Sequence, residues 1–143
     1  MPVGEDRREV GVLDTNAIIN LERLPPQDLP LKPLITTVTL AELSVGPLIA
    51  QSGDAAAERQ AHLQLAEADF EPLPFDAAAA RAFGRVSASL RRAGRKTKAR
   101  TFDAMIAAIA LANDLPIYTC NPADFSGIDD LRVIPLPVPP LRT

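Results

Sequence analysis

Short apolar runs alternate along the chain with longer segments in which apolar residues recur at helical spacing. The apolar runs predict strands at 10–13, 34–37, 117–119 and 132–134, with a short extended segment at 70–75. The longer segments predict helices at 17–24, 39–45, 55–68, 77–92 and 102–113. Because neighbouring parallel strands need crossover connections, this alternation favours an α/β fold in which helices flank a central parallel sheet.

Turn residues and helical spacing indicate where these helices end and which faces they bury. Pro25-Pro26 is expected to stop the first helix, and Gly46-Pro47 to stop the second after Val45. In the last predicted helix, four apolar residues recur on one face, which we expect to face the core: Phe102, Met105, Ile106 and Ile109.

The length and composition of the chain bound the number of domains. Its 143 residues, of which 47% are hydrophobic, are typical of one compact domain spanning 1–143. Residues 1–9 are charged and are expected to form an N-terminal extension. Residues 135–143 contain four of the fourteen prolines and are expected to form an extended, proline-rich tail.

Cysteine and histidine each occur once, as Cys120 and His62. They cannot build a disulfide framework or a Cys/His zinc site, which indicates a reducing, intracellular setting. No apolar run approaches the ~18 residues of a membrane span, so we expect a soluble cytoplasmic protein with no membrane partner. Cys120 is expected to be a small core residue, and His62 a solvated surface residue remote in sequence from every candidate acid.

Four acidic residues lie where predicted helices begin: Asp14, Glu42, Asp103 and Asp124. Each has an ordinary structural explanation. Asp14 can cap the first helix, Thr39 and Glu42 match a capping box, and Asp103 lies in a first turn, where the helix dipole favours negative charge. Asp124 follows Asn121-Pro122, which is typical of a capped helix start.

Taken together, the four acids predict a metal site. Three of them follow or closely trail a predicted strand, and the carboxyl ends of parallel strands lie along one edge of a sheet, where ligands bind. Clustered carboxylates repel one another unless a cation keeps them ionised. An all-oxygen ligand set selects Mg²⁺ or Mn²⁺, and Mg²⁺ is bound through one or two carboxylates together with substrate phosphates. The cluster therefore favours phosphodiester chemistry, and no Gly-rich phosphate loop, GxSxG or HExxH motif offers an alternative.

The net charge of −3 argues against a protein that binds nucleic acid over its whole surface, but the basic residues are unevenly distributed. Residues 91–100 contain no acid and six bases, which we call the basic stripe: Arg91, Arg92, Arg95, Lys96, Lys98 and Arg100. It is explained either as a solvated helix end or as a surface that binds RNA phosphates beside the carboxylates and steers a polyanion towards them. Asp76 also precedes a helix, but nothing beyond capping recommends it, so we leave it out of the site.

Four short motifs, in order, resemble the PIN-domain nucleases, and among them the VapC-type toxins of bacterial toxin-antitoxin pairs. The matching segments are Val12-Leu13-Asp14-Thr15-Asn16, Thr39-Leu40-Ala41-Glu42-Leu43, the run from Phe102-Asp103 to Ala110, and the run from Tyr118 through Asn121 to Asp124-Phe125. They span about residues 10 to 134. The one departure is that the first strand begins some ten residues into the chain.

The resemblance implies a three-layer PIN-like fold and hydrolytic cutting of RNA. It implies that Mg²⁺ or Mn²⁺ is bound at Asp14, Glu42, Asp103 and Asp124, with supporting roles for Thr15, Asn16 and Asn121. It also implies an antitoxin partner that blocks the site, and a homodimer.

The expected reaction is hydrolysis by an endoribonuclease with one or two metal ions, in which Glu42 either completes the metal shell or orients water. Attack by water predicts 5′-phosphate and 3′-hydroxyl ends. An aspartyl-nucleophile phosphatase is one alternative, but it needs a second aspartate where this chain has Asn16. A catalytically inactive interaction module is the other, and the retained acids count against it.

Overall fold

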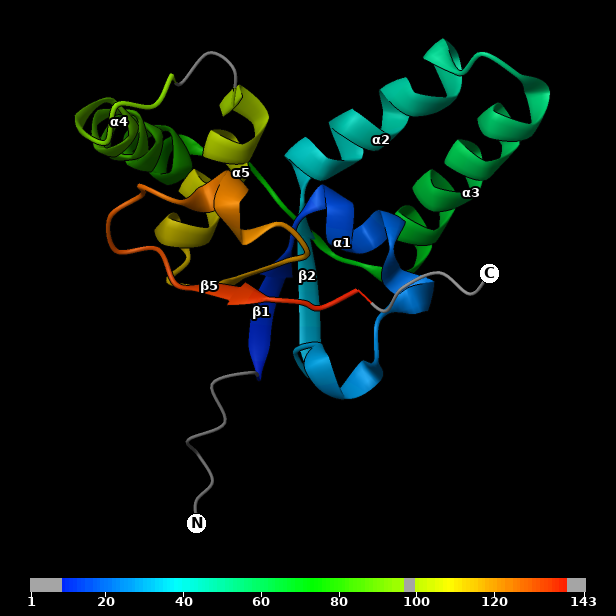
Figure 1. Cartoon of the computed structure of the whole chain (residues 1–143), viewed down its shortest axis with the longest axis horizontal. Helices are drawn as coiled ribbons and strands as arrows, with labels where there is room; N and C mark the ends of the chain where they lie inside the picture. Colours follow the sequence, from blue (N-terminus) through cyan, green and yellow to red (C-terminus); the bar gives the residue numbers. More distant parts are fainter. Residues whose placement is uncertain (1–8, 97–99, 139–143) are drawn as a thin grey trace.

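The computed structural model describes residues 9–96 and 100–138 (Figure 1). In this part of the chain, five strands form one sheet in the order β3-β2-β1-β4-β5, and every neighbouring pair is parallel. The strands are β1 (Val10–Leu13), β2 (Lys32–Thr36), β3 (Pro72–Leu73), β4 (Ile117–Thr119) and β5 (Val133–Pro135). The predicted parallel α/β architecture is confirmed.

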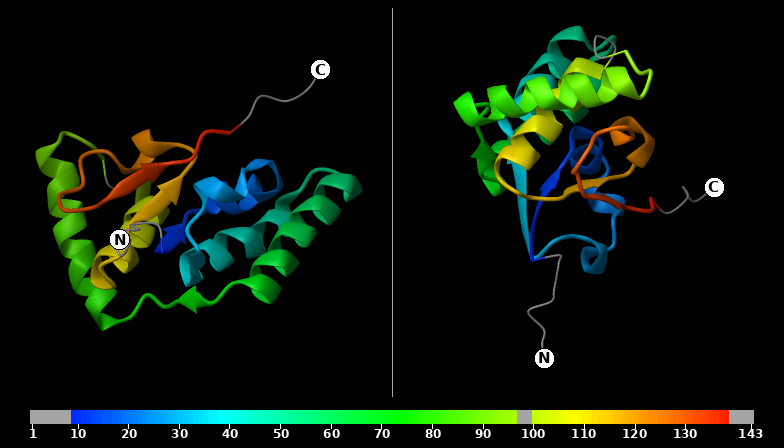
Figure 2. Two further views of the ribbon diagram at one scale, coloured as in Figure 1. Left: turned by 90° about the horizontal axis from the view of Figure 1, so that it is seen from below. Right: turned by 90° about the vertical axis from the view of Figure 1, so that its left-hand side faces the viewer.

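Helices connect the strands and cover both faces of the sheet. They are α1 (Thr15–Ile19), α2 (Thr37–Ile49), α3 (Gly53–Asp69), α4 (Ala77–Arg92) and α5 (Thr101–Ala112). Short 3₁₀ turns cover Leu21–Arg23, Pro26–Asp28 and Pro122–Phe125. In the left view of Figure 2, α4 and α5 lie on one side of the strands and α2 and α3 on the other. In the described residues, no helix is long and apolar enough to cross a membrane.

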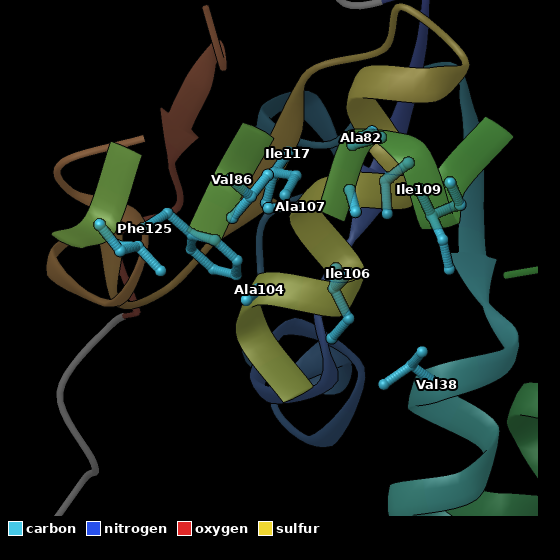
Figure 3. Close-up of a cluster of buried hydrophobic side chains, with 14 residues drawn as sticks. Val38, Ala82, Val86, Ala104, Ile106, Ala107, Ile109, Ile117 and Phe125 are labelled. Carbon is cyan, nitrogen blue, oxygen red and sulfur yellow. The ribbon is translucent and has the colours of Figure 1, made fainter. Parts of the chain in front are cut away.

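Two hydrophobic clusters form because successive side chains of a strand point to opposite faces of the sheet. In β1, Val12 packs in the cluster under α4 and α5, whereas the next residue, Leu13, packs in the cluster under α1 and α3. Ile117 and Tyr118 of β4 divide in the same way. Figure 3 shows the first cluster, in which alanines of α5 allow close packing against α4. The fold therefore has three layers with a core on each face.

The helix α2 differs from the prediction at both ends. It begins at Thr37, and the Thr36 hydroxyl caps it by accepting from the Thr39 N–H at 3.1 Å, so the expected capping box at Thr39 and Glu42 is wrong. It also continues through Gly46-Pro47 to Ile49. Proline has a helical φ and removes only one backbone donor, a loss that packing of α2 against α3 offsets.

Two further predictions need correction. The segment predicted as one helix at 17–24 divides into α1 and a 3₁₀ turn, because the chain leaves the helix at Asn20, whose side-chain amide donates to the Asn16 carbonyl at 2.9 Å. Phe102, predicted to face the core, is 53% exposed. It lies in the first turn of α5, ahead of the buried residues, which begin at Ala104, so helical spacing alone does not ensure its burial.

The beginning of the proline-rich segment packs as part of the sheet. Pro135 belongs to β5, and the Leu136 N–H donates to the Thr119 carbonyl at 2.8 Å. Leu136 is 2% exposed and lies in the cluster with Leu13. Most of the expected extension at 1–9, residues 139–143 and Lys98 lie outside the described residues.

Candidate active site

A cleft of about 340 Å³ opens at the carboxyl end of β1. Three of the four predicted acids line it, together with two of the predicted supporting residues: Asp14, Glu42, Asp103, Thr15 and Asn16. Asp124 is not among the residues that line this cleft. Its charge nevertheless acts on both Asp14 and Asp103, so the four acids form one electrostatic group, which we call the carboxylate cluster.

Asp14 is the most buried member of the cluster, with 2% of its surface exposed. It directly follows β1 and caps α1, because its Oδ1 accepts from the Ala17 N–H at 2.9 Å. Its other oxygen, Oδ2, accepts from the Thr119 hydroxyl at 2.6 Å. Burial raises the pKa of Asp14, and the two hydrogen bonds oppose that rise. Asp14 therefore caps a helix, as its ordinary explanation required, while it also lines the cleft.

Glu42 lies in the second turn of α2 and faces α1. The Thr15 hydroxyl donates to Glu42 Oε1 at 2.6 Å and lies 3.0 Å from the hydroxyl of Thr39. Burial raises the pKa of Glu42, whereas the bond from Thr15 lowers it. Thr15 thus positions a carboxylate of the cluster.

Asp103 is the third residue of α5, and its surroundings are the clearest sign that the acids converge. Burial and, after it, the charges of Asp124, Glu42 and Asp14 together raise its pKa to about 6, against the opposing charge of Arg100. Such mutual repulsion arises only when like charges are close and lack sufficient positive charge. This end of the sheet therefore has an excess of negative charge.

Asp124 lies in the 3₁₀ turn that follows β4, and its Oδ1 accepts from Arg100 Nη1 at 2.9 Å. Asn121 precedes this turn at the cap position and Pro122 opens it, as expected, but the Asn121 side chain makes no capping bond. Instead, the Asn121 backbone N–H donates to the Thr119 hydroxyl at 3.0 Å. Since that hydroxyl also donates to Asp14, Thr119 links the turn that carries Asp124 to the carboxylate at the end of β1.

The basic stripe divides between two surfaces. Arg100 pairs with Asp124, and Arg95 donates to the Ser126 hydroxyl and the Ala123 carbonyl, on either side of that residue. Arg92 instead pairs with the exposed Asp129 at 2.6 Å. Only part of the stripe therefore borders the carboxylate cluster. Outside the site, Asp76 caps α4 as expected, accepting from the Ala79 N–H at 3.0 Å.

The chemistry of the cluster suits a hard divalent cation, because its donors are carboxylate and hydroxyl oxygens. Within 9–96 and 100–138, however, no group of three histidine, cysteine, aspartate or glutamate side chains is arranged to hold an ion. Three of the four carboxylates are engaged by other side chains, Asp14 by Thr119, Glu42 by Thr15 and Asp124 by Arg100. The donor set thus fits a metal, while its present rotamers do not assemble a complete shell.

Sequence reasoning missed three residues at this site. Thr119 is fully buried, and its position at the end of β4 was the available signal. Arg59 and His62 of α3 line the same cleft as Asp14, although they lie in a polar helix far along the chain from every member of the carboxylate cluster. The expectation that His62 is a solvated surface residue is wrong, since it is half-buried in the cleft wall.

Comparisons with known proteins agree with this geometry. The PIN domain profile matches residues 11–131. The chain is 41% identical over 122 residues to Ribonuclease VapC5 of Mycobacterium tuberculosis, covering 83% of this chain and 87% of that protein. It is 38% identical over 100 residues to Ribonuclease VapC4 of the same organism, covering 70% of this chain and 74% of that protein. The crystal structure of VapBC-5, a toxin-antitoxin family member from that organism, superposes with a TM-score of 0.77 at 38% identity, covering 89% of this chain and 98% of that one. The chain belongs to the PIN-domain family.

Proposed function

We propose that this protein is the endoribonuclease toxin of a toxin-antitoxin pair, and that its carboxylate cluster hydrolyses RNA with Mg²⁺ or Mn²⁺. The observation that carries the proposal is the mutual repulsion of Asp14, Glu42, Asp103 and Asp124 at the carboxyl end of a parallel sheet. Relatives at 41% and 38% identity are named ribonucleases, which supports RNA as the substrate.

In this proposal Asp14, Asp103 and Asp124 hold the ion, and Glu42 either completes its shell or orients water. When bound, a divalent ion stabilises charge on the phosphate oxygens and makes water acidic enough to attack at neutral pH. Binding of the ion requires at least one side chain to rotate, because Glu42 accepts a hydrogen bond from Thr15 and Asp124 pairs with Arg100. Either change is a side-chain rotation that leaves the backbone of the sheet in place.

The remaining residues of the cluster position its carboxylates. Thr119 and the Ala17 N–H hold both oxygens of Asp14, so that carboxylate presents a fixed orientation to the cleft. Asn16 lines the cleft and Asn121 flanks Asp124, and we assign both to supporting roles. Since attack comes from water and not from a ribose hydroxyl, the products carry 5′-phosphate and 3′-hydroxyl ends.

The basic stripe guides RNA to the site. A cation beside the cleft raises the local concentration of a polyanion around an otherwise acidic protein. Arg95 and Arg100 are best placed for this role, because both contact the turn that carries Asp124. We extend the role to the rest of the stripe: Arg91, Arg92, Lys96 and Lys98.

An antitoxin protein is the proposed partner, and a homodimer the proposed assembly. The structure with 38% identity is a VapBC toxin-antitoxin protein. In this chain the second half of α2 exposes Val45, Leu48 and Ile49, of which Leu48 is 84% exposed. An exposed apolar group of this kind supports a protein partner on that helix.

The decisive experiment incubates the purified protein with total RNA, with and without Mg²⁺ or Mn²⁺, beside the variants Asp14→Asn and Asp103→Asn. Asp76→Asn is the matched control, because it makes the same chemical change in an exposed capping aspartate away from the cleft. Each site variant is expected to lose about 100-fold or more in cleavage rate, and the control to retain full activity.

Analysis of the RNA ends completes the test. Cleavage by both site variants at the parental rate would show that the carboxylate cluster is not the active site. Cyclic phosphate ends would contradict attack by water. A phosphorylated Asp14 would instead support the phosphatase alternative.

A further inference from the structure

The cleft extends beyond the carboxylates to a wall formed by α3. In Figure 1, α5, which carries Asp103, and α3 lie on opposite sides of α1. The cleft reaches from Asp103 past Thr15 to Arg59 and His62. Those two residues are three positions apart in a helix and therefore share a face. The wall formed by α3 thus presents one guanidinium and one imidazole to the same space as the acids.

Arg59 is held in place by α2. Its aliphatic stem crosses Gly46 so closely that a Cβ at that glycine would lie 3.2 Å from Arg59 Cδ. Its Nη1 donates at 3.0 Å to the carbonyl of Gly46, which lies in the last turn of α2. A guanidinium has five N–H donors, so one bond leaves others available for a ligand in the cleft.

His62 is less exposed than Arg59 and is shared between two cavities. It is half-buried and lines both the cleft and a neighbouring pocket between α1 and α3. An imidazole has an N–H donor in either neutral tautomer, which suits an anionic oxygen. His62 therefore adds a second donor on the same wall.

The charges in the cleft indicate which ligand this wall suits. Three carboxylates line the cleft, and they repel the phosphates of a polyanion. Among the described residues that line it, Arg59 carries the fixed positive charge, because Arg100 pairs with Asp124 and does not line the cleft. Guanidinium groups bind phosphate through two parallel hydrogen bonds. The wall thus offers phosphate recognition next to the acids.

We propose that Arg59 and His62 bind a backbone phosphate of single-stranded RNA beside the one that is cut, and so set the position of the strand in the cleft. This inference rests on the proposed function. It assigns the two residues to substrate binding, and it leaves the chemistry at the carboxylate cluster unchanged. The wall of α3 then acts as a strand-positioning surface that the acids alone could not provide.

The test compares steady-state cleavage by the parent with cleavage by Arg59→Gln, Arg59→Lys and His62→Gln. Arg85→Gln is the matched control, because Arg85 is exposed on α4 and lines a different pocket. For Arg59→Gln we expect KM to rise about tenfold with kcat within about twofold, since a charged hydrogen bond is lost in both ground and transition states. His62→Gln is expected to raise KM about threefold, and the control to match the parent.

A binding measurement separates this inference from the proposed function. Affinity for a fluorescent single-stranded RNA is measured without divalent ions, so that no cutting occurs, over a range of salt concentrations. Loss of one phosphate contact is expected to reduce the slope of log affinity against log salt by about 0.7 in Arg59→Gln, whereas Arg59→Lys keeps the parental slope. If the parent cuts no RNA, the proposed function is wrong. The salt dependence of RNA binding still tests whether Arg59 contacts a phosphate.

Thermal melting shows whether Arg59 acts only as a cap for α2. If Arg59→Gln unfolds, Arg59→Lys and His62→Gln carry the test instead. Folded variants with parental KM and parental salt slopes would overturn the proposal. A fall in kcat at constant KM would also overturn it, because that result would place the two residues in the chemical step.

Discussion

Arg100 Nη1 lies 2.9 Å from Asp124 Oδ1, so the last residue of the basic stripe pairs with a member of the carboxylate cluster. Both side chains are partly buried, at 32% and 21% exposure. The charge of Arg100 also lowers the pKa of Asp103. A cation from the protein thus occupies part of the position at which the proposed function requires a metal ion.

Arg100 is therefore expected to compete with the metal. In Arg100→Gln, Asp124 loses its partner, and we expect Mn²⁺ to bind up to about fivefold more tightly, which corresponds to the ~1 kcal/mol of a partly exposed ion pair. Isothermal titration without RNA measures the affinity. Arg92→Gln is the control, because its partner is Asp129. Weaker Mn²⁺ binding by Arg100→Gln would show that the pair helps to assemble the site.

Thr119 is expected to stabilise the fold through Asp14. Thr119→Val removes the hydroxyl that donates to the buried Oδ2 at 2.6 Å and leaves a carboxylate oxygen without that donor. The free energy of unfolding should fall by about 1–3 kcal/mol in urea denaturation. Thr119→Ser keeps the hydroxyl, so its free energy of unfolding should fall much less. A loss of stability in Thr119→Ser with none in Thr119→Val would indicate that packing of the threonine methyl matters, and not the hydrogen bond.

Ionisation of the cluster is expected to destabilise the protein when divalent ions are removed. The pKa of Asp103 is about 6 in the folded chain, against an ordinary value of 3.8. The protonated form is favoured by folding, so its contribution to stability is complete below about pH 3.8 and is lost as pH rises through about 6. In EDTA, the melting temperature of Asp103→Asn should therefore fall less than that of the parent as the pH rises from about 3.8 to above about 6. A parallel pH dependence of the two proteins would contradict this expectation.

Divalent ions should restore the stability that the protein loses above pH 6 when the carboxylate cluster is ionised. An ion that binds only the folded protein raises its stability by mass action, and it favours ionised carboxylates. The melting temperature of the parent at pH 7 is expected to rise on addition of Mn²⁺, while that of Asp14→Asn changes little. An equal rise in both proteins would place the binding site elsewhere.

Two glycines offer a matched test of packing. A Cβ at Gly11 of β1 would overlap Cε1 of the fully buried Tyr118, whereas a Cβ at Gly84 of α4 has nothing within 4 Å. Gly11→Ala should therefore destabilise the fold by about 1–3 kcal/mol. Gly84→Ala should stabilise it by about 0.5–1 kcal/mol, because alanine is the better helix former. Urea denaturation of both variants checks the contrast, and a stable Gly11→Ala would mean that Tyr118 can move aside.

The local pattern of the sequence determined the order of strands and helices and the placement of acids at one edge. Leu13 ends an apolar run and Asp14 follows it, so the acid lies at the carboxyl end of a strand whatever the rest of the chain does. The same reasoning applies to Asp103, in the first turn of α5. These features depend on neighbours in the sequence, and hydrophobic spacing reports such neighbours directly.

Only the tertiary structure decided which side chains meet across the site. The bond from Thr119 to Asp14 joins residues 105 positions apart. The helix α2 continues through Pro47, which the turn signal at Gly46-Pro47 did not predict, and it packs against α3, whose His62 lines the cleft. Apolar spacing shows which face of a helix is buried, but not which other element covers it. The partners of Asp14 and the wall of α3 were therefore set by packing between distant segments.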